Sequence, residues 1–393
     1  MNGLKIRGLY YITHIKNLPS ILEKGILSHS KVISENISFT PIYDEGIVTN
    51  RRDRKAPNGR ILWEFANLYF QPRNAMLYRI LLSSDISPSD IVIIGLKLNE
   101  ILKREDIYVT DGNAASPYTK FFSSKEINKH IGAILKQTDR EWWSDVDSSK
   151  RKIMAECLVP DKVGPECISE IYVPTKTVLD KVRSICGEKI PVIFEPRLFF
   201  LPSRQIKLTG TLTLVEGDMF FSRMQTLTIS VNTVGVMGKG LASRAKYQFP
   251  DVYVKYQYLC RKKILKLGKP YLYKREKSLD YELADDVSSL SNLNSHTWFL
   301  LFPTKNHWRE MSDIEGIKKG LEWLITNYKK EGIKSLAIPA LGCGLGGLQW
   351  SNMGPILCSY LKKLDIPVNL YLPLEQKIPD DQLSKEFLLG KGV

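Results

Sequence analysis

Residues 339–347, which read PALGCGLGG, decide the fold of the second half of the chain, since they place a glycine-rich loop directly after the apolar run at 335–338. A second glycine-rich stretch, residues 232–240 (NTVGVMGKG), follows another apolar run in the same way. Glycine at the end of a strand lets backbone N–H groups approach a phosphate, often where a helix starts. Neither stretch matches the Walker or GxGxxG motif. Two such loops in one sheet favour a clamp for a diphosphate over a pair of unrelated tight turns.

The segments around these loops alternate short apolar runs with amphipathic stretches. Residues 313–328 carry apolar side chains at helical spacing and predict a helix. Strands that alternate with such helices predict an α/β fold, with a mostly parallel sheet covered by helices on both faces. The buried strands expected on this basis are residues 211–215, 227–231, 298–302, 335–338 and 367–371.

A break in this pattern lies between residues 195 and 211, where two prolines and a glycine interrupt the sequence. It predicts a boundary near Ser203, with one domain over residues 1–203 and a second over residues 204–393. The first domain is expected to contain a helix and a basic loop, followed by strands and a polar, aromatic-rich segment. The helix is expected over residues 18–27 and the basic loop over residues 46–60. The strands are expected over residues 76–82, 91–94 and 153–159, and the polar, aromatic-rich segment over residues 106–147.

The composition limits the kinds of binding partner that the chain can have but does not identify one. The net charge is +14 and both halves are basic, which suits a dinucleotide or a nucleic acid but equally suits a merely solubilising surface. The six cysteines form no CxxC pair and the five histidines show no zinc spacing, so no metal is expected. No segment has the length of a signal-peptide core or of a membrane span, which predicts a cytoplasmic protein without a membrane partner.

Glu156 interrupts the apolar run at residues 153–159 (IMAECLV). A buried carboxylate without a partner is costly, so its presence in a strand-like run asks for an explanation. On the pattern alone, a glutamate on an edge strand facing water is the commoner explanation. Only the wider sequence context favours a catalytic carboxylate.

Five motifs of the first half occur in a recognisable order: residues 11–15 (YITHI), 17–22 (NLPSIL), 69–78 (YFQPRNAMLY), 111–113 (DGN) and 152–156 (KIMAE). Together they resemble the DarT family, and the resemblance covers about residues 7–200. It implies the split-sheet α/β fold of ADP-ribosyltransferases, with NAD as donor and thymidine in single-stranded DNA as acceptor. Tyr11 stands where the family has a histidine, and Asn74-Ala75 replace its usual Ser-Pro.

The resemblance also implies roles for particular residues of the first half. Thr13, His14 and Ile15 would line the NAD pocket. Glu156 would stabilise the positive charge on the ribose as nicotinamide leaves. Arg51 would position the thymine or help to remove its proton, although arginine is a poor base.

Two questions about this half stay open at the level of sequence. Arg52 and Arg54 are close enough to Arg51 that either could be the matching arginine. Residues 118–151, with Phe121, Phe122, Trp142, Trp143 and several lysines, would be the loop that binds the acceptor. Aromatic and basic residues together suit single-stranded nucleic acid, but a satellite hydrophobic cluster is an equal alternative.

The second half carries its own set of motifs: residues 217–218 (GD), 231–240, 302–309 (FPTKNHWR) and 339–350. In combination they resemble the macro domain of the DarG family over about residues 207–373. That resemblance implies a mixed sheet sandwiched by helices, which binds ADP-ribose and removes it from modified thymidine in DNA.

Matched position by position, Asp218 would hold the adenine amino group and Asn232 would contact the distal ribose. Lys305 would act on the glycosidic bond, a role that a lowered lysine pKa would support. The diphosphate and distal ribose would be wrapped by one loop, which contains Gly342, Gly344, Leu345, Gly346 and Gly347.

The sequence departs from the family pattern at several positions, so alternative functions stay open for both halves of the chain. Ser230 stands where the family has the first asparagine of VNTVN, and Gln349 replaces a common aspartate. The second half could therefore read ADP-ribose without removing it. The acceptor of the first half could likewise be RNA or protein.

Overall fold

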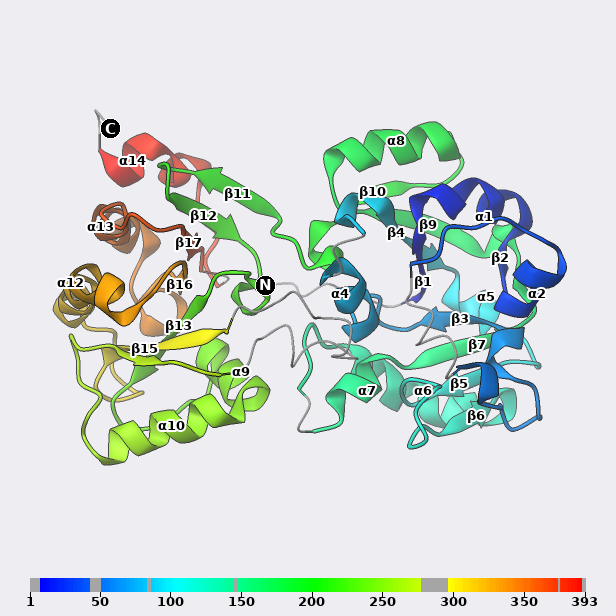
Figure 1. Cartoon of the computed structure of the whole chain (residues 1–393), viewed down its shortest axis with the longest axis horizontal. Coiled ribbons are helices and arrows are strands. Elements are labelled where there is room, and N and C mark those ends of the chain that lie inside the picture. The colour runs from blue at the N-terminus through cyan, green and yellow to red at the C-terminus, as the bar shows by residue number, and fades with distance from the viewer. Residues whose placement is uncertain are drawn as a thin grey trace. The chain divides into compact units, whose positions relative to one another are not determined.

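The computed structural model describes residues 8–42, 51–82, 86–144, 147–276, 296–373 and 375–390. Contacts divide the chain into two compact units, and the division falls between Leu201 and Pro202 (Figure 1). The boundary expected from the sequence lies two residues further along the chain.

The N-terminal unit is built on one eight-stranded sheet in the order β10-β9-β4-β1-β3-β7-β5-β6. All neighbours pair antiparallel except β9 and β10. A separate two-stranded sheet joins β2 (Ile26–Leu27) to β8 (Lys162–Val163). The strands of the large sheet are β1 (Leu9–His14), β3 (Phe65–Tyr69), β4 (Ile91–Leu96), β5 (Tyr108–Thr110), β6 (Phe121–Ser123), β7 (Glu156–Pro160), β9 (Ile168–Val173) and β10 (Val192–Phe194).

The large sheet is nearly divided at its centre. β1 pairs with β4 through six residue pairs but with β3 only through Tyr10 and Tyr69. Beyond that pair β1 and β3 separate. Tyr11, Ile12 and Thr13 therefore pair with β4 on one side of β1 and border a gap on the side that faces β3. The split-sheet fold expected for this half is confirmed, and the split locates its cavity.

Helices of this unit cover the sheet (Figure 1), and residues of α1, α2 and α4 contribute to the lining of the cavity. The helix expected over residues 18–27 ends earlier, because Gly25 adopts φ 86° and Ile26 starts a strand. Residues 106–147 are more ordered than expected, since they include β5, β6 and the longest helix of this unit among the described residues. The helices are α1 (Leu18–Lys24), α2 (His29–Ser34), α4 (Ala75–Leu82), α5 (Leu98–Ile101), α6 (Ser124–Thr138), α7 (Ser149–Ile153) and α8 (Lys176–Cys186).

One prediction for this half is wrong: residues 76–82 form helix α4, not a strand. Asn74 starts the helix, with its side-chain oxygen accepting the Leu77 N–H at 3.0 Å and its carbonyl accepting the Tyr78 N–H at 3.0 Å. Nearly every residue of α4 is buried. A helix that is apolar on all sides shows no amphipathic period, so its sequence cannot be told from a buried strand.

The C-terminal unit contains a seven-stranded sheet in the order β11-β12-β17-β16-β13-β15-β14. The five central strands are parallel, and the two edge strands run antiparallel to their neighbours. The five strands expected from the sequence are these central ones. The bounds are β11 (Arg204–Lys207), β12 (Leu212–Glu216), β13 (Thr226–Asn232), β14 (Tyr271–Tyr273), β15 (Trp298–Lys305), β16 (Leu336–Pro339) and β17 (Val368–Tyr371).

Helices cover both faces of this second sheet (Figure 1). On one face Leu300 and Phe302 of β15 share a core with α12 (Ile314–Glu331) and α13 (Trp350–Leu361). On the other face Phe299 meets Phe249, which precedes α10 (Pro250–Arg261), with ring centroids 5.0 Å apart. The mixed, helix-sandwiched sheet expected for this half is confirmed. Helices α9 (Gly240–Gln248) and α14 (Lys385–Leu389) complete the unit.

Candidate active sites

Glu156 is the first residue of β7, and its side chain is fully buried beside the split in the N-terminal sheet. The loop after β5 holds it in place: the Ala114 N–H donates to one carboxylate oxygen at 2.8 Å. The Thr110 hydroxyl accepts the Glu156 backbone N–H at 2.9 Å and donates to the Gly112 carbonyl at 2.7 Å. Glu156 is therefore not a water-facing edge glutamate. Thr110 and Ala114 were not anticipated, because nothing in the DGN motif shows which side chain its turn supports.

Arg51 binds Glu156 through both guanidinium arms, with contacts of 3.1 and 2.7 Å to the two carboxylate oxygens. Its neighbours point elsewhere. Arg52 lies over the Trp63 ring at 5.6 Å, and Arg54 lies over the Phe121 ring at 5.9 Å. The geometry thus separates three arginines that the sequence could not. A bidentate arginine–carboxylate contact is among the strongest polar contacts in proteins.

The charge state of Arg51 follows from this contact. Burial by itself would lower the pKa of the guanidinium, but the charge and hydrogen bonds of Glu156 outweigh burial and raise that pKa above its ordinary value. Arg51 therefore stays a cation while it is paired. It can orient an anion or a polar base and stabilise negative charge, but it cannot accept a proton in this state.

A cavity of about 230 Å³ lies along the split in the sheet, and Arg51 forms part of its wall. Thr13 lines it, as expected, but His14 and Ile15 are not among the lining residues. The His14 ring accepts the Lys16 N–H at 3.0 Å instead, and Ile15 belongs to the hydrophobic core. The other walls come from β3, from the segment after α2, from the loop after β5 and from α4, among them Asn67, Tyr69, Phe39, Thr40, Asn113, Ala115, Met76 and Arg79.

Part of the cavity lining is aromatic. The His29 ring meets Trp63 with centroids 4.2 Å apart, and Phe39 lies edge-on to His29 at 6.0 Å. Burial lowers the pKa of His29, so its ring is neutral near pH 7. A cavity lined by neutral aromatic rings and by an arginine suits a ligand with a flat base and a charged centre.

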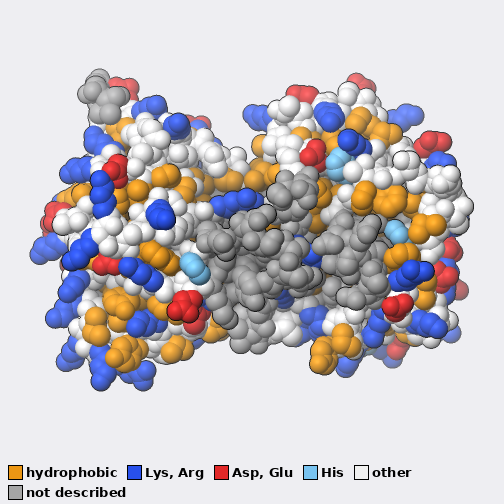
Figure 2. All heavy atoms as spheres, viewed as in Figure 1, with side chains coloured by type: hydrophobic (Ala, Val, Ile, Leu, Met, Phe, Trp, Pro, Cys, Tyr) orange, Lys and Arg blue, Asp and Glu red, His pale blue; other side chains and the backbone are white. Residues whose placement is uncertain are grey.

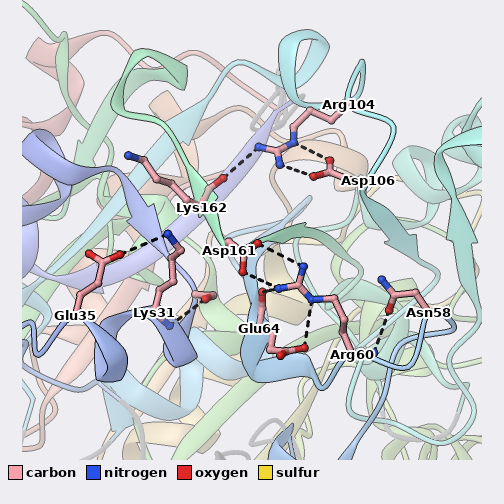
Figure 3. A network of polar contacts seen from close by, with 10 residues as sticks. Lys31, Glu35, Asn58, Arg60, Glu64, Arg104, Asp106, Asp161 and Lys162 are labelled. Atoms are coloured by element: carbon pink, nitrogen blue, oxygen red, sulfur yellow. Dashed lines mark hydrogen bonds and ion pairs between the residues drawn. The ribbon is translucent and has the colours of Figure 1, made fainter.

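An ion-pair network fixes this aromatic part of the lining to the strand that carries Glu156 (Figure 3). Arg60 contacts Asp161, which follows β7, at 2.6 Å and Glu64 at 3.2 Å. The Asp161 N–H donates to the Glu64 carbonyl at 2.9 Å, and the Asp161 carbonyl accepts the Ser28 N–H at 2.7 Å. The turn after β7 is thereby tied to the segment of Trp63 and to the start of α2.

The segment expected to bind the acceptor, residues 118–151, is only partly available for that role. Trp143 is fully buried against Tyr78 and Phe200, so the hydrophobic-cluster alternative is right for this residue. Phe122 stacks on His130 with centroids 3.9 Å apart. Tyr118, in contrast, is 83% exposed on the loop that also carries Asn113 and Ala115 of the cavity wall.

In the C-terminal unit the candidate residues gather where the parallel strands end. Asn232 ends β13 and Lys305 ends β15, and the two are register partners across an irregularity in the pairing. The Asn232 side chain organises the loop that follows, since it donates to the Val236 carbonyl at 2.6 Å and accepts the Val234 N–H at 3.1 Å. It also accepts the Tyr256 hydroxyl at 2.8 Å.

Lys305 reaches the second glycine-rich loop. Its Nζ donates to the Glu310 carbonyl at 2.7 Å and to the Leu345 carbonyl at 3.4 Å. Burial lowers the pKa of Lys305, and the nearby charge of Glu310 opposes that shift only in part. The amine is thus easier to deprotonate than an ordinary lysine.

The two glycine-rich loops face each other. A Cβ on Gly240 would lie 2.9 Å from the Leu345 side chain, and one on Gly346 would lie 2.5 Å from the Ser312 hydroxyl oxygen. Gly342, Gly344 and Gly347 have φ values of 79°, 65° and 81°, which only glycine adopts without strain. The Ser312 hydroxyl is buried and has no hydrogen-bond partner among the described residues.

Asp218 lies at the start of a short helical turn and accepts the Phe220 N–H at 3.1 Å. Its carboxylate also binds Arg244 of α9 at 2.7 Å. Arg244 lies over the Phe220 ring at 4.8 Å, so a planar cation, a carboxylate and an aromatic ring meet here. Arg244 was not anticipated, since a single arginine in a helix carries no motif.

Metal sites and membrane-spanning helices are both absent from the described ranges. In them, no three His, Cys, Asp or Glu side chains come together as a metal site would require. None of the helices resolved there combines the length and apolarity that crossing a bilayer demands.

Comparison with known proteins agrees with this geometry. A family model described as "ssDNA thymidine ADP-ribosyltransferase, DarT" matches residues 10–200, and a macro-domain model matches residues 287–357. The DNA ADP-ribosyl glycohydrolase of Thermus aquaticus is 33% identical over 165 residues, which are 42% of this chain and 42% of that protein.

Two comparisons span nearly the whole chain. The DNA ADP-ribosyl transferase–DNA ADP-ribosyl glycohydrolase fusion protein of Thermosipho africanus is 61% identical over 98% of this chain and 99% of its own length. The solved structure of Thermosipho africanus DarTG in complex with ADP-ribose matches with a TM-score of 0.92 at 61% identity, covering 98% of this chain and 100% of that one.

A split-sheet unit with a buried glutamate–arginine pair, joined to a macro fold with facing glycine loops, defines an ADP-ribosyltransferase fused to a macro domain. The comparisons identify the family within this class. The chain belongs to the DarTG family of DNA ADP-ribosyl transferase–DNA ADP-ribosyl glycohydrolase fusion proteins.

Proposed function

We propose that the N-terminal unit transfers ADP-ribose from NAD to thymidine in single-stranded DNA, and that the C-terminal unit removes it. The observation that carries the proposal is the buried Glu156 carboxylate, held by Arg51 at the wall of the cavity along the split sheet. The six cysteines are free thiols, which suits the reducing cytoplasm that we propose as the location. We place the domain boundary at residues 203/204.

In the forward reaction, the bond between nicotinamide and its ribose breaks, and its electron pair leaves with nicotinamide. The ribose carbon becomes cation-like, and a fixed carboxylate beside it lowers the barrier. Glu156 supplies that charge. The acceptor base then forms the new bond to the same carbon and releases its proton to solvent water. Arg51 holds the base and balances the negative charge on it as a guanidinium cation, which has no lone pair to accept a proton.

NAD fits the cavity by its chemistry. A flat base can stack on the aromatic part of the lining with Trp63 and Phe39, while the nicotinamide riboside lies toward Thr13 and Arg51. The Arg51–Glu156 contact must open or rotate when the ribose hydroxyls approach the carboxylate. His14 and Ile15 are not among the residues that line the cavity, so they are proposed not to touch the donor.

The acceptor strand is proposed to lie over the loop after β5. Tyr118 exposes its ring there, and the Arg54 guanidinium donates to the Ser116 carbonyl at 3.4 Å beneath it. An exposed aromatic ring beside arginine is a platform for an unstacked base. A second aromatic platform, Trp143, is excluded by its burial.

In the removal reaction, ADP-ribose is proposed to lie between the facing glycine loops with its adenine at Asp218. Ser312 would offer its free buried hydroxyl to the diphosphate region. Lys305, with its lowered pKa, would act at the glycosidic bond. Asn232 acts first by shaping the loop, since its side chain already makes hydrogen bonds there.

The test is mass spectrometry of a thymidine-containing oligonucleotide after incubation of the full chain with NAD. A mass increase of one ADP-ribose per strand is expected for Lys305→Ala, in which removal is lost, a smaller increase for the wild type, and none for Glu156→Ala. Labelling that survives Glu156→Ala would show that this glutamate is not the catalytic carboxylate. RNA and protein serve as alternative acceptors in the same assay, and pre-modified oligonucleotide without NAD distinguishes removal from mere binding.

A further inference from the structure

Helix α10 of the C-terminal unit has two dissimilar faces. Its inner face supports the candidate site, because Tyr256 donates its hydroxyl to the Asn232 side chain at 2.8 Å. Its outer face exposes apolar side chains one turn apart, with Val254 61% and Tyr258 44% exposed. Apolar side chains that lie next to one another on the solvent-exposed face of a helix are typical of a surface that contacts another molecule.

Lysines of α9 and α10 lie beside aromatic rings of α9, α10 and β14. Lys246 Nζ lies 5.3 Å from the Tyr247 ring and 4.8 Å from the Tyr253 ring. Lys255 Nζ lies 5.6 Å from the Tyr258 ring and 5.5 Å from the Tyr271 ring. Each ammonium group is thereby held among rings whose remaining surface stays available for stacking.

The chain that follows α10 adds further positive charge. Residues 261–269 read RKKILKLGK, and their lysines and arginine are exposed. Over residues 246–275, all of which the structure describes, Asp251 is the single acidic residue, and it pairs with Arg275 at 2.7 Å. No carboxylate in the described ranges forms an ion pair with Lys246, Lys255 or the lysines of 261–269.

Figure 2 shows this surface at the lower left of the C-terminal unit, where Lys and Arg side chains alternate with apolar ones over the position of α10. Acidic side chains are sparse there by comparison. Aromatic rings interleaved with unpaired cations match the chemistry of single-stranded nucleic acid, which offers bases for stacking and phosphates for charge contacts.

We infer that the outer face of α10 and residues 261–269 form an exosite for the single-stranded DNA that flanks an ADP-ribosylated nucleotide. Through Tyr256, the helix that binds the strand is the helix that shapes the Asn232 loop. The exosite increases the affinity of the C-terminal unit for modified DNA without touching ADP-ribose. The inference rests on the glycohydrolase activity proposed above.

The experiment compares removal of ADP-ribose from a modified oligothymidine strand and from modified thymidine monophosphate, with the full chain and without NAD. For Lys262→Glu/Lys266→Glu, KM for the strand should rise about tenfold, and the slope of log KM against log salt should fall by about 1 to 2. The mononucleotide kinetics should not change. Tyr258→Ala should raise KM for the strand and leave the salt slope unchanged, because it removes stacking alone.

Lys330→Glu/Lys363→Glu, on the opposite side of the same sheet, is the matched control and should keep wild-type kinetics on both substrates. An unchanged KM for the strand in Lys262→Glu/Lys266→Glu at low salt would overturn the exosite. So would an equal loss on strand and mononucleotide, which would indicate damage to the fold. Failure of the wild type on the mononucleotide as well as the strand would instead count against the glycohydrolase proposal.

Discussion

At the scale of single residues, both candidate sites depend on charges whose state is set by burial and by one partner. Glu156 is fully buried yet charge-balanced by Arg51, and Lys305 is partly desolvated and only weakly compensated by Glu310. Burial lowers the pKa of both cations. The charge and hydrogen bonds of Glu156 outweigh burial at Arg51 and raise its pKa, whereas Glu310 offsets burial only in part at Lys305, whose pKa is lowered. Each can be tested by changing one side chain.

Arg51→Lys is expected to reduce the rate of DNA labelling about a hundredfold or more, because lysine keeps the charge but cannot make the two-armed contact with Glu156. Initial rates with oligothymidine and NAD measure the effect. Arg52→Lys is the matched control, since Arg52 is exposed over Trp63, and its rate should change less than about threefold. An equal loss in both variants would contradict the assignment.

Removal of ADP-ribose should depend on pH through Lys305. Because its pKa is lowered, the neutral amine increases as pH rises and does so at a lower pH than for an ordinary lysine. If the amine acts in its neutral form, the rate on pre-modified DNA rises with pH below the ordinary lysine value. Lys305→Met should abolish this rise and Lys330→Met should preserve it. A rise that persists in Lys305→Met would show that another group titrates.

At the scale of elements, close approach of a helix to a strand determines the stability of the C-terminal unit. Gly320 of α12 faces Phe302 of β15, and a Cβ there would lie 2.5 Å from the ring. Gly132 of α6 is also helical, but nothing lies within 4 Å of its Cβ position. Intrinsic helix propensity treats the two glycines alike, whereas packing does not.

Gly320→Ala is expected to destabilise the protein by about 1–3 kcal/mol, since overpacking against Phe302 outweighs the gain in helix propensity. Gly132→Ala should instead stabilise the N-terminal unit by about 0.5–1 kcal/mol. Urea unfolding followed by circular dichroism measures both. Stabilisation by Gly320→Ala would mean that α12 can move away from the sheet without cost.

At the scale of the whole molecule, one chain carries two opposed activities on the same ligand. Because the two units are parts of one chain, they are always present in equal amounts. The steady-state level of modified DNA is therefore the balance of two rates rather than the output of one enzyme. Neither unit needs a separate partner to meet the other's product.

Loss of removal should expose the transferase. Lys305→Ala is expected to increase DNA labelling and to make expression of the chain toxic to a bacterial host. The double variant Glu156→Ala/Lys305→Ala should be unlabelled and harmless, which separates toxicity from misfolding. Toxicity of the double variant equal to that of Lys305→Ala would rule out DNA modification as its cause.

The sequence by itself was sufficient for the features that depend on local pattern. Alternating apolar and amphipathic segments predicted the central parallel strands of the second sheet, and motif order indicated both families. The prediction of a strand over residues 76–82 was wrong, because a helix buried on all sides shows no amphipathic period in its sequence. The strand was expected to start at Ile153, but β7 starts at Glu156. Ile153, Met154 and Ala155, which end α7 and link it to β7, are apolar and buried too, so the apolar run does not mark where the strand begins.

Tertiary structure alone decided the site geometry, because its contacts join residues far apart in the chain. Arg51 and Glu156 are 105 positions apart, and the motif match that favoured Arg51 left Arg52 and Arg54 open as alternatives; the two-armed contact with Glu156 distinguishes Arg51 from both. Contacts between distant segments likewise decide the pairing of Arg244 with Asp218, the burial of Trp143 and the two faces of α10. Local sequence determines which segments become strands and helices, whereas the balance of charge and burial at each site arises only when those segments meet.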